Sequence, residues 1–181
     1  MQGKVKDFKK FRLIVVLLCT AAIFMLLVFP ILHESGHLLA AKAFGSRHSS
    51  LKLGFIQAWA GFDGCFTQGQ FSIIHIYGMG FPLLLWYIFI ILVSKETIWW
   101  IEPIKLVFSA SVIGSLIVWI VVPILYMSGK APMSEDATKF TISTEWNGYV
   151  IAAMALLVFI ASIILFIRKS NFRKIFIEGK Y

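Results

Sequence analysis

Two histidines and a glutamate lie together near the end of an apolar segment, where residues 32–38 read Leu-His-Glu-Ser-Gly-His-Leu. His33 and His37 are four residues apart, so on a helix their side chains lie on the same face, one turn apart. Two imidazoles at this spacing can bind one Zn²⁺ ion. Glu34 follows the first histidine and can accept a proton from a water molecule at the metal. The pattern therefore predicts a zinc site in which Glu34 is the general base.

The alternative for this motif is a polar helix end that is satisfied by water and has no chemical role. Residues 38–41 after the motif are Leu-Leu-Ala-Ala, so the polar side chains interrupt an apolar helix rather than end it. Ionisable groups in such a segment are usually functional, because a bilayer makes them costly. The order His-Glu-x-x-His is the zinc-binding motif of metalloproteases. A metal site that hydrolyses a peptide bond is therefore the preferred interpretation.

A catalytic zinc site needs a third protein ligand. The extended motif with a third histidine is absent, because Ala40 and Ala43 occupy the positions of its glycine and histidine. Topology alone leaves two aspartates on the expected side of the membrane, with further carboxylates and one histidine as other candidates. These are Asp63 and Asp136, then Glu135, Glu145 and His75.

The elements that must hold these residues are predicted to be membrane-spanning helices. Of the 181 residues, 59% are hydrophobic, above the roughly 45–50% of soluble domains. Four stretches have the length that a bilayer requires, about 20 apolar residues, and contain no Asp, Glu, Lys or Arg: Leu13–Leu32, Phe71–Val93, Leu106–Met127 and Trp146–Ile167. The first is too long for the apolar region of a signal peptide and no cleavage site follows it. The expected fold is an all-α integral membrane protein with about four transmembrane helices.

Two short elements are predicted between these helices. Apolar residues alternate with others in Ser49–Phe55, which indicates a strand. Residues 61–64, Gly-Phe-Asp-Gly, suit a turn. A small β-hairpin in the first outer loop is expected, with an irregular loop as the alternative. Ser134 is expected to cap a short helix that has Glu135 and Asp136 in its first turn.

The net charge of +8 is distributed as in a membrane protein. Twelve of the 17 Lys and Arg residues lie on one side of a four-span topology, which predicts that both termini are cytoplasmic. The chain divides into a basic lead (1–12), a single membrane domain (13–167) and a basic tail (168–181). The expected partner of the basic segments is the lipid bilayer, not nucleic acid. His33 lies about 30 Å along the helix from Arg12, towards the outer face.

Taken together, these features resemble the site-2-protease family of intramembrane zinc metalloproteases, over about residues 20–145. The marks are His33-Glu34-Ser35-Gly36-His37 at the end of a transmembrane helix, a following loop with strand character, and two later segments. Tyr77–Pro82 resembles the Ala-Gly-Pro stretch with which a family span opens, and Glu135-Asp136-Ala137 resembles the family's acidic motif.

The resemblance implies zinc bound by His33, His37 and Asp136, with Glu34 as base and a membrane-anchored protein or peptide as substrate. It also implies that the hairpin edge pairs with an unwound substrate segment. The chain departs from the family in having Ala137 where glycine is common, and in an outer rather than a cytoplasmic position for the zinc. Two other functions are considered: an inactive family member that binds a partner in the membrane, and a transporter or channel subunit with a histidine relay.

Overall fold

The computed structural model describes residues 2–54, 58–93 and 101–171. Four of its helical segments are long and apolar enough to cross a membrane: Ile14–Ala43, Gln68–Leu92, Ile101–Met127 and Gly148–Lys169. The elements in chain order are α1 (Gln2–Ile23), η1 (Phe24–Val28), α2 (Phe29–Ala43), β1 (Ser49–Leu53), β2 (Ala58–Phe62), α3 (Gln68–Leu92), α4 (Ile101–Met127), α5 (Asp136–Thr144) and α6 (Gly148–Lys169). The predicted class, a helical membrane protein with four spans and a small hairpin, is confirmed.

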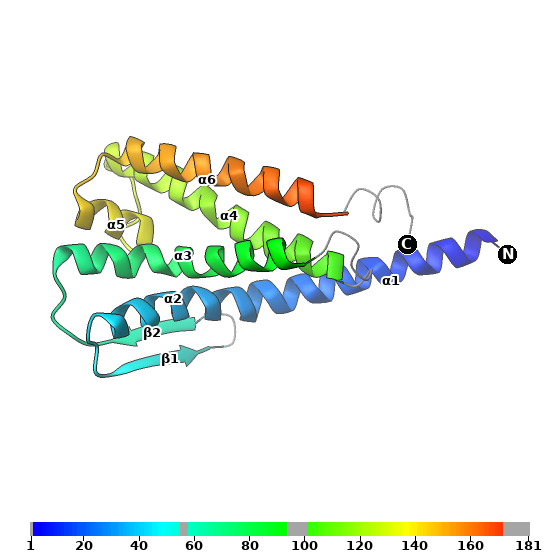
Figure 1. The fold of residues 1–181 in the computed structure, drawn as a ribbon, viewed down its shortest axis with the longest axis horizontal. Coiled ribbons are helices and arrows are strands. Elements are labelled where there is room, and N and C mark those ends of the chain that lie inside the picture. Colours follow the sequence, from blue (N-terminus) through cyan, green and yellow to red (C-terminus); the bar gives the residue numbers. More distant parts are fainter. Residues whose placement is uncertain (1, 55–57, 94–100, 172–181) are drawn as a thin grey trace.

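The first span is one long rod made of α1, η1 and α2 (Figure 1). It does not end near Leu32 but continues through the His-Glu-x-x-His motif to Ala43. Within the rod, η1 is π-helical: the backbone N–H of Phe29 donates to the carbonyl of Phe24, five residues earlier. The ring of Phe24 is buried against Phe108 of α4, with centroids 4.8 Å apart. The motif therefore lies on a helix whose preceding turn is packed against α4.

Different elements gather at the two ends of the helix bundle. In Figure 1, α1 begins at the end to which α6 returns, while the hairpin and α5 lie at the opposite end. The α2 helix packs on α3, and α4 packs on α6. The shared core is aromatic and aliphatic, and at its centre Trp86 is fully buried and donates a hydrogen bond from Nε1 to Ser109 at 2.8 Å. The motif and α5 are thus brought to the same end of the bundle.

The hairpin forms as expected, but its turn does not lie at residues 61–64. Gly61 and Phe62 belong to β2, where they pair with Ser50 and Ser49 of β1. The strands are joined through residues 54–57, of which 55–57 lie outside the described residues. The physical reason is Asp63, whose Oδ1 accepts hydrogen bonds from the backbone N–H groups of Arg47 and His48 and so fixes the open end of the hairpin.

Two other expectations need correction, and one cannot be compared with the structure. Glu135, not Ser134, is the N-cap residue of α5, and its side chain makes no capping hydrogen bond. The Tyr77–Pro82 element lies in the interior of α3 rather than at its start, because Thr67 and Gln70 form a capping box that begins the helix earlier. Residues 172–181 of the predicted basic tail lie outside the described residues.

Candidate metal centre

Two helices far apart in the sequence bring three possible metal ligands together. His33 and His37 come from α2, and Asp136 is the first residue of α5. The Oδ2 atom of Asp136 lies 3.0 Å from Nε2 of His33 and 2.9 Å from Nε2 of His37. The two Nε2 atoms are 3.3 Å apart. Among the described residues, these three form the one group of His, Cys, Asp or Glu side chains that could hold a metal ion.

The spacing and the chemistry of these three atoms fit zinc. Four ligand atoms arranged as a tetrahedron around Zn²⁺ at about 2.0 Å lie about 3.3 Å from one another. The observed separations of 2.9, 3.0 and 3.3 Å are close to that value. Two imidazoles and one carboxylate are also a ligand set of catalytic zinc sites, which leave the fourth position open. The residues present therefore suit a catalytic rather than a purely structural metal.

A second hydrogen bond fixes the orientation of His37. Its Nδ1 donates to the backbone carbonyl of Ile74 on α3 at 2.7 Å, and the side chain is buried. Because Nδ1 keeps its proton for this bond, Nε2 is the ring nitrogen that can give up its proton and bind a metal. The Ile74 carbonyl therefore selects the tautomer that a ligand requires.

Close packing of α2 on α3 makes that contact possible. A Cβ atom added at Gly78 would lie 2.4 Å from the ring of His37. A Cβ atom added at Gly36 would lie 2.1 Å from the carbonyl oxygen of Tyr77. Real side chains do not tolerate such distances, so both positions require glycine for helices this close. Gly80 differs, because an added Cβ atom there would meet nothing within 4 Å.

The carboxylate of Asp136 is held by a third histidine and faces a lysine. Nδ1 of His75 lies 3.2 Å from Oδ1, the oxygen that the other two histidines do not contact. Nζ of Lys139 lies 4.0 Å from the same oxygen. Burial opposes ionisation of Asp136, but hydrogen bonds with His33, His37 and His75 outweigh it and hold the pKa of this carboxyl well below its usual range. Asp136 is therefore a carboxylate at neutral pH, as a metal ligand must be.

Glu34 lies beside this group and is tied to the hairpin. Its Oε2 accepts a hydrogen bond from the backbone N–H of Ala60 in β2 at 2.8 Å. Both residues line a cavity of about 360 Å³ that contains polar and apolar side chains from α2, β2, α3 and α5. Its lining residues are Glu34, His37, Trp59, Ala60, Phe62, His75, Ser134, Asp136 and Lys139. A substrate carbonyl placed in this cavity can meet the ligands and the glutamate together.

The other candidates for the third ligand make different contacts and lie outside the group of three. Asp63 is bonded to the loop before β1. Glu145 is the C-cap residue of α5 and accepts a hydrogen bond from Gln68 at 3.2 Å. Glu135 precedes α5 as its N-cap. His75 contacts Asp136 from the side away from His33 and His37, so it supports the carboxylate instead of completing the ligand set.

Sequence reasoning missed two groups that line the cavity. Lys139 lies three residues after Asp136, and this spacing on a helix could have placed it on the same face. The N–H of Ala60 left no signal in the sequence, because it is a backbone group that reaches the cavity only once the hairpin has packed on α2.

Comparison with known proteins adds no family to these observations. No protein-family model, no curated protein and no solved structure matches the chain. The resemblance to site-2 proteases therefore stays a prediction that rests on the motif and on the residues gathered around it.

Proposed function

We propose that this chain is a zinc-dependent intramembrane endopeptidase, which hydrolyses a peptide bond in or near a transmembrane segment of a membrane protein or peptide. The observation that carries the proposal is the convergence of His33, His37 and Asp136 from two distant helices, with Glu34 on the wall of the adjoining cavity. A carboxylate that lines the cavity beside the ligand group without belonging to it favours catalysis over a merely structural metal site.

The roles of the side chains follow from their positions. Zinc held by His33, His37 and Asp136 would lower the pKa of a water molecule and polarise the substrate carbonyl. Glu34 accepts the proton of the attacking water and later donates it to the leaving amine nitrogen. The N–H of Ala60 orients the glutamate towards the cavity, and His75 keeps the Asp136 carboxylate turned towards the two imidazoles.

The hairpin supplies a way to hold a substrate in an extended form. The N–H of Ala60 points to Glu34 and not to β1, so it belongs to the edge of β2 that pairs with no other strand among the described residues. An unwound substrate segment can add to this edge as a further strand and lie across the cavity. Peptide bonds inside a helix are already hydrogen-bonded, so local unwinding is required before water can attack.

The membrane setting is part of the proposal. The basic residues around the spans favour a multi-pass protein of the cell membrane with both termini in the cytoplasm. The metal centre then lies near the outer face.

The decisive experiment compares the wild type with Glu34→Gln and His37→Ala. Zinc per purified chain is measured by elemental mass spectrometry, and new N-termini of membrane proteins are mapped in cells that make each form. The proposal expects about one zinc in the wild type and in Glu34→Gln, little in His37→Ala, and new N-termini only with the wild type. Zinc in both forms with no difference in N-termini would overturn the protease and favour an inactive, partner-binding role.

A further inference from the structure

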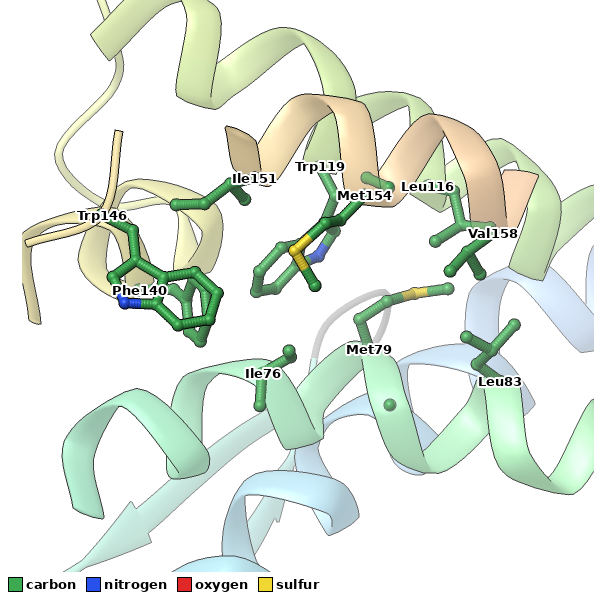
Figure 2. Close-up of a pocket in the computed structure, with 12 residues that line it drawn as sticks. Ile76, Met79, Leu83, Leu116, Trp119, Phe140, Trp146, Ile151, Met154 and Val158 are labelled. Atoms are coloured by element: carbon green, nitrogen blue, oxygen red, sulfur yellow. The ribbon is translucent and has the colours of Figure 1, made fainter. Parts of the chain in front are cut away.

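A second cavity lies on the opposite side of α3 from the histidines, between α3 and α6. Its volume is about 300 Å³, and its lining is almost wholly apolar. Figure 2 shows Ile76, Met79 and Leu83 of α3 facing Ile151, Met154 and Val158 of α6 across the space. Leu116 and Trp119 of α4 and Phe140 of α5 form its floor. The lining is complete with Gly80, Trp146 and Ala155.

The cavity is open on one side, as the different exposure of its floor and its rim shows. Leu116, Trp119 and Phe140 are buried, whereas Ile76, Trp146 and Met154 are exposed. The α3 and α6 helices touch each other far less than α6 touches α4. They diverge and leave a groove between two candidate spans. Whatever surrounds the spans therefore faces the mouth of the groove.

The length of the groove fits within one leaflet of a bilayer. Ile151 and Val158 are seven residues apart on α6, so the lined part is about 10 Å long. It begins within one turn of the start of α6, and Trp146 at its rim precedes that helix. Tryptophan is enriched at the membrane interface. Half of a hydrocarbon core of about 30 Å is about 15 Å, so the groove runs from the interface towards the bilayer centre.

We infer that this groove is a binding site for one acyl chain of a phospholipid in the leaflet nearer α5. Water has little reason to fill it, because the lining presents almost no polar surface with which water could form hydrogen bonds. At this depth the surrounding solvent is hydrocarbon, which packs against apolar side chains without losing hydrogen bonds. The open space beside Gly80 provides room for the chain along α3. The bound chain contacts Phe140, one turn after Asp136, and so supports the helix that carries this residue.

Quenching by lipids with brominated acyl chains tests the inference without any activity assay. Single-tryptophan variants that keep only Trp119 or only Trp86 are reconstituted in these lipids. Bromine quenches tryptophan on contact, so Trp119 on the groove floor is expected to lose fluorescence, while the fully buried Trp86 keeps it. Trp119 quenched no more than Trp86 would overturn the proposal.

A filled groove provides the matched control. Gly80→Leu places a side chain in the groove and is expected to protect Trp119, whereas Gly114→Leu, also in open space but outside the groove, is expected to leave the quenching unchanged. Equal quenching in both variants would refute the site. Protection of Trp119 at high protein density that is lost on dilution with lipid would instead mean that a second copy covers the groove.

Native mass spectrometry gives a second measurement that needs no tryptophan substitution. Wild type and Gly114→Leu are expected to retain a phospholipid that Gly80→Leu loses. Equal retention by all three forms would contradict the proposal.

Discussion

The Nδ1 atom of His37 donates to the carbonyl oxygen of Ile74 at 2.7 Å, and this bond turns Nε2 towards Asp136, 2.9 Å away. One helix thus supplies a candidate ligand, and its neighbour fixes the tautomer of that histidine. Second partners of this kind determine how well a histidine binds a metal. The candidate metal centre therefore depends on the packing of α2 against α3 as much as on the motif itself.

Replacing Asp136 or Glu135 tests which of these two adjacent acids, the first residue of α5 or its N-cap, binds the metal. Asp136→Ala is expected to abolish zinc binding, because it removes the carboxylate that lies within 3.0 Å of both histidine Nε2 atoms. Glu135→Ala is the matched control and is expected to keep about one zinc per chain, since Glu135 only precedes the helix. Elemental mass spectrometry of the purified variants gives the answer. Zinc that survives in Asp136→Ala but not in Glu135→Ala would transfer the ligand role to Glu135.

A larger residue at position 78 of α3 is expected to displace His37 and so disrupt the candidate metal site. The added methyl group of Gly78→Ala would meet the His37 ring at 2.4 Å, so the helices must separate or the ring must turn. Overpacking of this kind costs about 1–3 kcal/mol of unfolding free energy. The melting temperature in detergent and the zinc content per chain are both expected to fall. Gly80→Ala serves as control, because its methyl group enters open space and alanine favours a helix over glycine by about 1 kcal/mol. Equal behaviour of the two variants would show that close packing at Gly78 is unimportant.

His75 is expected to act through Asp136. The His75→Ala change removes the hydrogen bond to Oδ1 of Asp136 while leaving the three ligand atoms in place. Loss of such a supporting partner typically weakens metal affinity about 10–100-fold. Competition with a chelator of known zinc affinity measures this change. Complete loss of zinc, as in His37→Ala, would instead make His75 a ligand, and unchanged affinity would remove it from the site.

Asp63 is expected to make the stability of the first loop depend on pH. A backbone hydrogen bond from His48, aided by Ser46 and Arg47, lowers the pKa of Asp63 although the side chain is exposed. A lowered pKa in the folded state stabilises the fold above the unfolded-state pKa of about 3.9, and this contribution is lost as the pH falls through the folded-state pKa. The melting temperature of the wild type should therefore exceed that of Asp63→Asn at pH 7, and the gap should close in acid. A gap that is constant with pH would refute this role.

The proposed topology places Cys65 outside the cell. This residue is exposed in the segment between β2 and α3, so a membrane-impermeant maleimide is expected to label it in intact cells. Cys65→Ser is the control and should abolish that labelling, because Cys19 lies within the first span. Labelling that appears only after the cells are broken would reverse the orientation, and would place the metal centre at the cytoplasmic face.

The sequence allowed the spans and the two histidines to be predicted, because both depend on local spacing. Apolar runs of membrane length identify helices directly, and His33 and His37 share a face on any α-helix. The position of the hairpin turn was wrong, because Gly61 and Asp63 look like turn residues but Asp63 is used to bind backbone N–H groups of a distant loop.

The rest of the site depends on contacts between elements. Neither the support of Asp136 by His75 nor the bond between Glu34 and Ala60 follows from spacing, since each joins elements that are separated by loops. Gly78 and Gly80 look alike in the sequence. The space beside Gly78 is occupied by the His37 ring, whereas Gly80 faces open space. The packing of α3 against α2 therefore determines which of the two positions requires glycine.

The π-helical turn η1 rotates the second half of the first span about the helix axis relative to the first half. An extra residue within a helix rotates everything after it by about 100° relative to an uninterrupted helix, since one turn holds 3.6 residues. The part before η1 faces α4, and the part after it faces α3. A single rod thereby packs against two neighbouring helices, and His37 lies on the face that meets α3. Removing one residue from Phe24–Val28 would cancel this offset and turn the motif away from α5 without altering any ligand.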